Sequence, residues 1–262
     1  MAGSVSLEVR GGVARVVLDR PERGNVLDQE MKDGLVAAVE AIERDAAVRA
    51  VVLTAAGKTF CAGGDIAAMR AAGPERLPGW IGEMAAALGK AVLAIARLPV
   101  PVVSAVQGPV AGGGIGLALS ADVVLAGESM RLRGGYTAIG LTPDLGASWF
   151  LARRVGPARA KEIFFLNRAL TAKECLEWGI VNAVHADLLV VAEAEAVARR
   201  LAEGATSALA RAKRLVDGAL VRSLEEHLAR ETESMVESAR TSDAGEGLGA
   251  FLEKRPPKFT GR

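Results

Sequence analysis

The sequence predicts an α/β fold in which a mostly parallel sheet is followed by a helical C-terminal region. Short β-branched runs alternate with helical segments as far as about residue 135, which is the order of parallel strands joined by crossover helices. Beyond residue 190 every segment has helical periodicity. We therefore expect an α/β core over residues 1–190 and a helical region over residues 191–262.

The N-terminal elements carry clear local signals. β-branched runs on both sides of Gly11 and Gly12 are typical of a β-hairpin. Asp28 is a good N-cap, and apolar residues then recur at helical spacing up to Ile42. The short apolar run at residues 49–55 predicts a strand that is covered on both faces.

Strand and helix continue to alternate after this strand, and the strand signal nearly vanishes beyond Leu145. There Thr171 and Glu174 form a capping box, and Gly179 marks a helix end. The predicted elements are a helix at 78–98, a strand at 99–108, a helix at 113–122, a strand at 123–128, a last strand at 181–185 and tail helices from about 190.

Composition limits the kind of protein. Half of the 262 residues are hydrophobic, which allows a large core, and no apolar run is long and unbroken enough to span a membrane. The net charge of +1, with acids and bases interspersed, argues against nucleic acid as a partner. Cys61 and Cys175 form neither a disulfide framework nor a metal motif, and no secretory signal is visible. We expect a cytoplasmic location, no metal and no membrane partner.

Two glycine-rich loops, at residues 57–66 and 107–122, follow predicted strands and open predicted helices. Glycines at such junctions let backbone N–H groups point at an anionic ligand. The alternative is that these glycines only permit tight turns and close packing. A dinucleotide-binding G-x-G-x-x-G pattern is disfavoured because Leu117 or Leu119 stands at its last position, and a Walker A loop lacks its Gly-Lys-Ser/Thr.

Six segments in order along the chain resemble the enoyl-CoA hydratase/isomerase family, the crotonases. They are LDRPERGNVLD, FCAGGDI, AVQGPVAGGGIGLALSAD, IGLTPDLGAS, TAKECLEWGIVNAV and SDAGEGLGAFLEKRPPKF. The resemblance implies a spiral of ββα units, a helical trimerisation region at the C-terminus, and an acyl-CoA thioester as substrate with no further cofactor. It also implies a homotrimer or a dimer of trimers. The apolar stripe of Leu224, Leu228 and Met235 favours such a partner surface.

The device that crotonases share is an oxyanion hole of two backbone N–H groups, which the resemblance places on Gly64 and Gly113. Removing a proton next to a thioester carbonyl builds negative charge on its oxygen. One fixed donor to that oxygen is typically worth about 2.7–4 kcal/mol in the transition state. Main-chain donors need no side chain, which explains why both loops are rich in glycine.

The resemblance puts Gly116 and Tyr136 where hydratases carry the two glutamates that hold and activate water. Glycine cannot transfer a proton, and tyrosine, with an ordinary pKa of about 10, is a poor base near neutral pH. Asp144 resembles the catalytic residue of a single-aspartate isomerase branch, and its neighbours Leu141 and Leu145 favour a raised pKa. The alternative is that Asp144 is the N-cap of the following helix.

These assignments predict an enzyme that converts 3-enoyl-CoA to 2-enoyl-CoA, with Asp144 moving the proton and the oxyanion hole holding the dienolate. A hydratase or another crotonase reaction stays open, as does an acyl-CoA-binding paralogue without turnover. His185 and His227 lie outside the matched catalytic segments and receive no role. Cys61 is interpreted as a small packing residue.

The remaining candidates are substrate-binding residues implied by the resemblance. Arg23 and Lys258 match positions near the nucleotide of CoA, and Lys258 reaches a neighbouring subunit in this interpretation. Met69 lines the acyl pocket or belongs to the core, and Tyr136 orients substrate or fills space. The full predicted set is Arg23, Ala62, Asp65, Ile66, Met69, Gly116, Tyr136 and Lys258.

Overall fold

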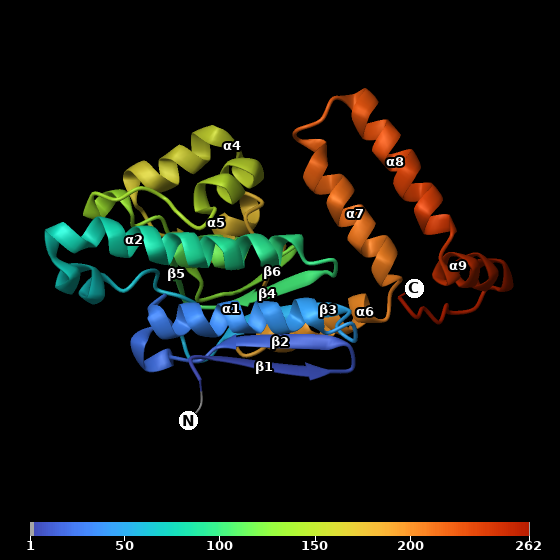
Figure 1. The fold of residues 1–262 in the computed structure, drawn as a ribbon, viewed down its shortest axis with the longest axis horizontal. Coiled ribbons are helices and arrows are strands. Elements are labelled where there is room, and N and C mark those ends of the chain that lie inside the picture. Colours follow the sequence, from blue (N-terminus) through green and yellow to red (C-terminus); the bar gives the residue numbers. More distant parts are fainter. Residues whose placement is uncertain (1–2, 262) are drawn as a thin grey trace.

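The computed structural model describes residues 3–261, and in this part of the chain it contains two sheets (Figure 1). The larger sheet has the strand order β1-β2-β3-β4-β6-β9, and the smaller has the order β5-β7-β8. The larger sheet consists of β1 (Val5–Arg10), β2 (Val13–Leu18), β3 (Ala50–Ala55), β4 (Val102–Val106), β6 (Val123–Gly127) and β9 (Ala183–His185). The smaller consists of β5 (Pro109–Ala111), β7 (Arg131–Arg133) and β8 (Leu170–Thr171).

The larger sheet begins with the predicted hairpin. β1 and β2 are antiparallel, and Gly11 and Gly12 form the turn between them. Their φ angles of 57° and 78° lie in the left-handed region, which glycine adopts without steric strain. From β2 onward each neighbouring pair of strands is parallel. Since parallel strands share one carboxyl edge, the loops that follow β3 and β4 leave the sheet on the same side.

Helices cover both faces of the larger sheet, as the apolar run at residues 49–55 predicts. Val51 and Leu53 of β3 belong to the main core, together with α1 (Gln29–Arg44) and α2 (Ile66–Arg97). The alternate residue Val52 belongs to a second core formed with α6 (Val190–Ala202). Successive side chains of a strand point to opposite faces, so the prediction of a strand buried on both faces is confirmed.

The two predicted caps are also confirmed. The Asp28 carboxylate accepts a hydrogen bond from the Met31 N–H at the start of α1. Thr171 and Glu174 form the capping box of α5 (Ala172–Glu177), in which each side chain accepts a hydrogen bond from the backbone N–H of the other residue. Backbone hydrogen bonds from Thr171 and the neighbouring Arg168 guanidinium lower the pKa of Glu174 to about 2.

The smaller sheet and three further elements form the end of the molecule that carries the glycine loops. These are α3 (Gly113–Leu119), the 3-10 turn η2 (Thr137–Ile139) and α4 (Ala147–Leu166). The sequence does not predict β5, β7 and β8 as separate strands. They have three, three and two residues, which is too short for a periodic pattern to appear.

The C-terminal helices are α7 (Thr206–Ala219), α8 (Leu224–Ala239) and α9 (Ser242–Glu253). In Figure 1 α7 and α8 lie side by side and stand away from the sheet, whereas α6, which begins at the predicted boundary near residue 190, packs on the sheet. α8 has no buried residue. Its large apolar side chains are therefore not covered within one chain.

One helix among the described residues, α2, is long and apolar enough to cross a membrane by length and composition alone. Its backbone departs from helical geometry at Gly73, just before Pro74, and its residues Leu88 and Val92 belong to the main core. Core helices of globular proteins pass the same test. The expected absence of a membrane partner stays a prediction.

Candidate functional site

The two glycine loops meet at the carboxyl edge of the parallel strands. Cys61 and Val110 form an isolated parallel bridge, in which the Ala111 N–H donates to the Cys61 carbonyl at 3.0 Å. Gly63 (φ 97°) lies against the Ala111 carbonyl, so that a side chain at residue 63 would crowd this backbone. Because Gly63 has no side chain, the backbones of the two loops can lie in direct contact there.

Gly64 follows Gly63 by one residue, and Gly113 follows Ala111 by two. Among the described residues, no carbonyl or side chain accepts a hydrogen bond from either N–H group. Gly113 is the first residue of α3, where a backbone N–H has no partner within the helix. Both N–H groups are thus unpaired within the described part of the chain, and their role in an oxyanion hole stays a proposal.

Asp144 and Tyr136 form a hydrogen-bonded pair beside these loops. The Tyr136 hydroxyl donates to Asp144 Oδ1 at 2.7 Å. Burial raises the pKa of Asp144 above its ordinary value, and the hydrogen bond from Tyr136 opposes that shift. Burial and the neighbouring carboxylate raise the pKa of Tyr136, so its hydroxyl stays protonated and can donate. The predicted direction of the Asp144 pKa is confirmed.

The carboxylate of Asp144 does not cap the next helix. The N-cap of α4 is Gly146, without a side-chain hydrogen bond, and the Ala147 N–H bonds to the main-chain carbonyl of Asp144. The alternative interpretation of Asp144 as a side-chain N-cap is therefore wrong. Its carboxylate is directed instead at the only tyrosine in the chain.

Gly116, where a hydratase would carry a glutamate, is buried against the backbone of the Asp144 loop. A Cβ at this position would overlap the Leu145 carbonyl oxygen. Leu145 has a positive φ of 47°, unusual for a residue with a side chain, and its side chain covers Gly113. The space next to Gly116 is therefore filled by main chain, and this loop conformation has no room for a longer residue there.

Of the other predicted binding residues near the first loop, one contacts Gly64 and two form an ion pair with each other. The methyl group of Met69 lies directly against Gly64, which places this side chain at the site. Asp65 caps α2 by accepting from the Ala68 N–H, and it also pairs with Arg23 at 2.6 Å. Arg23 pairs with Asp28 as well, at 2.8 Å. Asp28 and Asp65 therefore both form ion pairs with the guanidinium of Arg23.

Ala62 and Ile66 are exposed at the rim of the same loop. The Ala62 N–H donates to the Gly24 carbonyl, which ties this rim to the turn that carries Arg23. An exposed apolar side chain such as Ile66 can contact a ligand without rearrangement of the core. Whether these two residues border CoA stays a prediction.

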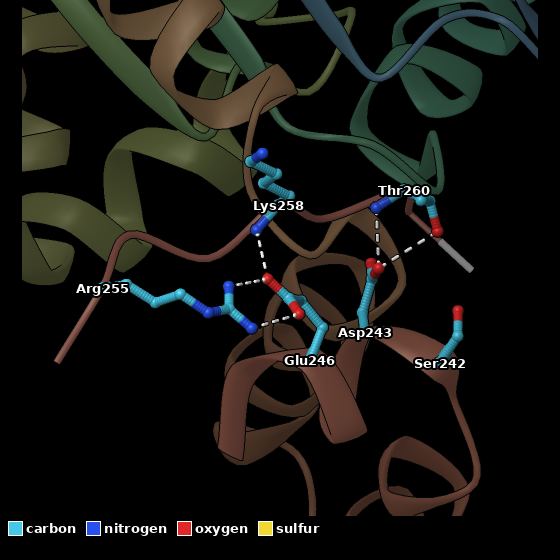
Figure 2. Close-up of a pocket in the computed structure, with 6 residues that line it drawn as sticks. All are labelled: Ser242, Asp243, Glu246, Arg255, Lys258 and Thr260. Carbon is cyan, nitrogen blue, oxygen red and sulfur yellow. Dashed lines mark hydrogen bonds and ion pairs between the residues drawn. The ribbon is translucent and has the colours of Figure 1, made fainter. Parts of the chain in front are cut away.

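The structure does not bring Lys258 together with the other candidates within one chain. Lys258 lies in the C-terminal tail, and its backbone N–H donates to Glu246, which also pairs with Arg255 (Figure 2). Asp243 accepts from Thr260 in the same hollow, and the Lys258 side chain points away from Glu246. Lys258 also lines a hollow with Arg49, which precedes β3, whereas Gly64 follows the opposite end of that strand.

A family model described as enoyl-CoA hydratase/isomerase matches residues 8–262. The chain belongs to the enoyl-CoA hydratase/isomerase family. Relatives with isomerase names include 1,2-epoxyphenylacetyl-CoA isomerase of Escherichia coli K12, 35% identical over 97% of each chain. Another is trans-2-decenoyl-[acyl-carrier-protein] isomerase of Streptococcus mutans, 32% identical over 97% of each chain. A Rhodobacter capsulatus protein named "Probable enoyl-CoA hydratase" is 38% identical over 99% of this chain and 98% of its own.

Solved structures of family members have the same fold. An enoyl-CoA hydratase from Polaromonas sp. JS666 superposes with a TM-score of 0.93 at 33% identity, covering 98% of this chain and 100% of that chain. The predicted crotonase-like α/β fold is therefore confirmed. Isomerase and hydratase names both occur among these family members, so family membership alone leaves the reaction of this chain open.

The remaining cysteine and histidine candidates fit structural roles. Cys61 is completely buried, and burial raises the pKa of its thiol to about 12, which makes it unreactive near neutral pH. His227 belongs to α8 and contacts Glu231 of the same helix. The described residues contain no group of three or more His, Cys, Asp or Glu side chains that could hold a metal ion. The expected absence of a metal stays a prediction.

Sequence reasoning named Leu145 as an apolar neighbour of Asp144 and missed its backbone conformation. Its left-handed backbone sets the direction of the carbonyl that blocks residue 116, and its side chain covers Gly113. The sequence shows only a leucine beside Gly146, and leucine rarely adopts a positive φ. No local pattern could have revealed this conformation, because contacts with α3 impose it.

Proposed function

We propose that the chain is an enoyl-CoA isomerase that moves a double bond from the 3,4 to the 2,3 position of an acyl-CoA. The observation that carries the proposal is the half-buried carboxylate of Asp144 next to two loops whose Gly64 and Gly113 N–H groups are unpaired. A shuttle of one proton between two carbons needs one base, whereas hydration needs a positioned water as well.

In the proposed reaction Asp144 removes a proton from C2 of a 3-enoyl-CoA. The electrons of the broken C–H bond delocalise through the double bond onto the thioester oxygen, which the N–H groups of Gly64 and Gly113 stabilise as a dienolate. Asp144 then returns the proton to C4, and the double bond ends between C2 and C3. No atom is gained or lost, and the carboxylate is regenerated.

Burial helps Asp144 to act as a base. A carboxylate with its ordinary pKa is a weak base, and burial raises the pKa of Asp144 toward the range in which it can accept a carbon-bound proton. Met69, which lies against Gly64, and Leu145, which covers Gly113, would surround the acyl chain with apolar atoms. An apolar surrounding strengthens the hydrogen bonds to the dienolate oxygen.

Hydration is disfavoured by the two positions that hydratases fill with glutamate. Tyr136 has no carboxylate, and its hydroxyl is committed to Asp144. At Gly116 the Leu145 carbonyl fills the space that a side chain would need. We therefore propose that the chain adds water to 2-enoyl-CoA poorly.

The proposal includes a trimer or a dimer of trimers in the cytoplasm, with Lys258 reaching the CoA of a neighbouring copy. In one chain Lys258 lies beside Arg49, at the far end of β3 from the glycine loops. A second copy would have to supply the lysine to complete the nucleotide site. The exposed apolar side chains of α8 supply a surface for such assembly.

The test is a panel of 3-enoyl-CoA and 2-enoyl-CoA substrates, followed by ultraviolet absorbance and mass spectrometry with purified protein. Isomerisation of 3-enoyl-CoA without a mass change is expected, with little water addition. Efficient hydration of crotonyl-CoA without isomerisation would contradict the proposal. Thermal stabilisation by acyl-CoA without any conversion would identify a binding protein instead.

A further inference from the structure

Tyr136 is the only tyrosine in the chain, and its hydroxyl contacts the carboxylate of Asp144. Its ring is buried, with 8% of the residue exposed. Among the described residues, Tyr136 is the one side chain that hydrogen-bonds to Asp144, and it does so at Oδ1, while a backbone hydrogen bond from Asp144 itself also favours the carboxylate. The two carboxylate oxygens are thus in different environments.

We propose that Tyr136 is a positioning residue that holds Oδ1 of Asp144, so that Oδ2 alone carries the proton between the two carbons. This inference rests on the isomerase function proposed above. A shuttle needs the same atom to face C2 and then C4, and rotation of a free carboxylate would change which oxygen faces the substrate. The hydrogen bond from Tyr136 restricts that rotation.

The surroundings of Tyr136 are rigid enough for this task. Its carbonyl accepts hydrogen bonds from the N–H groups of Ile139 and Leu141, both at 3.0 Å, which fix the turn that carries it. Its ring packs at a tilt against Phe164 of α4, with centroids 6.1 Å apart. Asp144 lies just before the same helix, so α4 supports both partners.

The pair also controls the charge of Asp144. Burial favours the neutral carboxyl group, while the donated hydrogen bond favours the carboxylate and so lowers the pKa. The remaining titratable group facing the pair is the Cys61 thiol, whose pKa burial raises to about 12. Burial and the neighbouring carboxylate raise the pKa of Tyr136 as well, so of the three groups Asp144 is the one whose titration the acid limb follows.

The first test is the pH profile of isomerisation by Tyr136→Phe, which removes one hydroxyl and keeps the ring. Without the hydrogen bond the pKa of Asp144 rises, so the acid limb of kcat/KM moves to higher pH. On that limb kcat falls roughly 10-fold or more, as expected for the loss of a hydrogen bond to a charged group, while KM changes little. Thr142→Val is the control, because it removes an exposed hydroxyl from the same loop.

A double-mutant cycle separates positioning from general loss of packing. If Tyr136 acts through Asp144, Tyr136→Phe has no further effect on the residual activity of Asp144→Asn. An equal loss of activity in both backgrounds would overturn the inference. So would a Tyr136→Phe profile with an unshifted acid limb.

The second test needs no turnover. In protein labelled with ¹³C at the tyrosine ζ carbon, the single tyrosine yields one NMR signal from Tyr136. This signal should move as Asp144 titrates, and the movement should vanish in Asp144→Asn. A signal that stays flat below neutral pH in an active enzyme would overturn the role of Tyr136. A signal that titrates in a protein without isomerase activity would instead overturn the proposed function and leave the contact standing.

Discussion

The glycine-loop end and the C-terminal helices differ in how far one chain covers their large apolar side chains. At the loops, Leu145 and Tyr136 are buried by the chain itself and surround one carboxylate. On α8 and α9, Leu224, Met235 and Phe251 are 74%, 71% and 82% exposed.

This difference shows which region is fully packed within one chain and which region leaves its apolar side chains uncovered. The hydrogen-bonded pair of Tyr136 and Asp144 at the loops forms from contacts within one chain. The tail leaves large apolar side chains in water, which a stable protein usually covers with a partner. Variants of the two regions should therefore affect different measurements, activity for the loops and assembly for the tail.

The largest effect is expected for Asp144→Asn, which removes the base and keeps the shape. Isomerisation of 3-enoyl-CoA should fall by roughly 100- to 10,000-fold, the usual contribution of a positioned acid–base group. Assembly should not change, which sharpens the contrast between the two regions. Ultraviolet assays and sedimentation measure the two outcomes. Retention of most of the activity would show that another group moves the proton.

The next effect concerns the tail. Replacing Leu224, Leu228 and Met235 by Gln keeps good helix formers on α8 and removes the apolar stripe. If a partner covers these side chains, each loss costs about 1.5–3 kcal/mol of assembly free energy, and the oligomer dissociates. Thr232→Gln on the same helix is the control. Light scattering at micromolar concentration checks the state, and a monomeric wild type would break the comparison.

The third effect distinguishes a glycine packed against backbone from a glycine with open space around it. Gly116→Ala should destabilise the fold by about 1–3 kcal/mol, because the new methyl group meets the Leu145 carbonyl. Gly82→Ala is the matched control, since Gly82 lies in α2 and a Cβ there meets nothing within 4 Å. That substitution should stabilise by up to about 1 kcal/mol. Denaturant unfolding compares the two, and equal stabilities would argue against the tight contact.

The fourth prediction is a pH dependence of stability. Burial raises the folded-state pKa of Asp144, so between its ordinary value and the raised value the native state binds more protons than the unfolded state. The contribution of Asp144 to the free energy of unfolding is fully present below its ordinary pKa. It is lost as pH rises through the folded-state pKa. Asp144→Asn should therefore melt at a higher temperature than wild type near pH 7, and this difference should shrink below the ordinary pKa. Calorimetry at several pH values tests the sign.

The smallest effect is expected at the CoA end. Lys258→Ala and Arg23→Ala should weaken CoA binding at low salt with little change in turnover at saturation, because exposed ion pairs contribute about 0–1 kcal/mol. Arg23 must first leave Asp28 and Asp65, which reduces its net contribution. Titration calorimetry at low and high salt measures the loss. Unchanged affinity for Lys258→Ala would remove this residue from the nucleotide site.

The sequence by itself determined the elements whose signals are local. Caps such as Asp28 and Thr171 act within one helical turn, and the hairpin at Gly11–Gly12 depends on adjacent residues, so each could be predicted from a few positions. The matched segments likewise identified the family, and they pointed to Asp144 as a candidate because its position in GLTPDLG is visible in the sequence.

Only the tertiary structure decided what surrounds those residues. Whether Asp144 caps a helix or faces Tyr136 depends on how the turn at residues 137–139 packs against α4, and the carboxylate turns to Tyr136. The Leu145 carbonyl reaches Gly116 because α3 and the loop before α4 meet across the sheet edge. Local propensity cannot specify such contacts, because they form only when segments distant in the sequence pack together in one buried space. There the backbone also adopts a conformation that its residues do not favour by themselves, as Leu145 does with its positive φ.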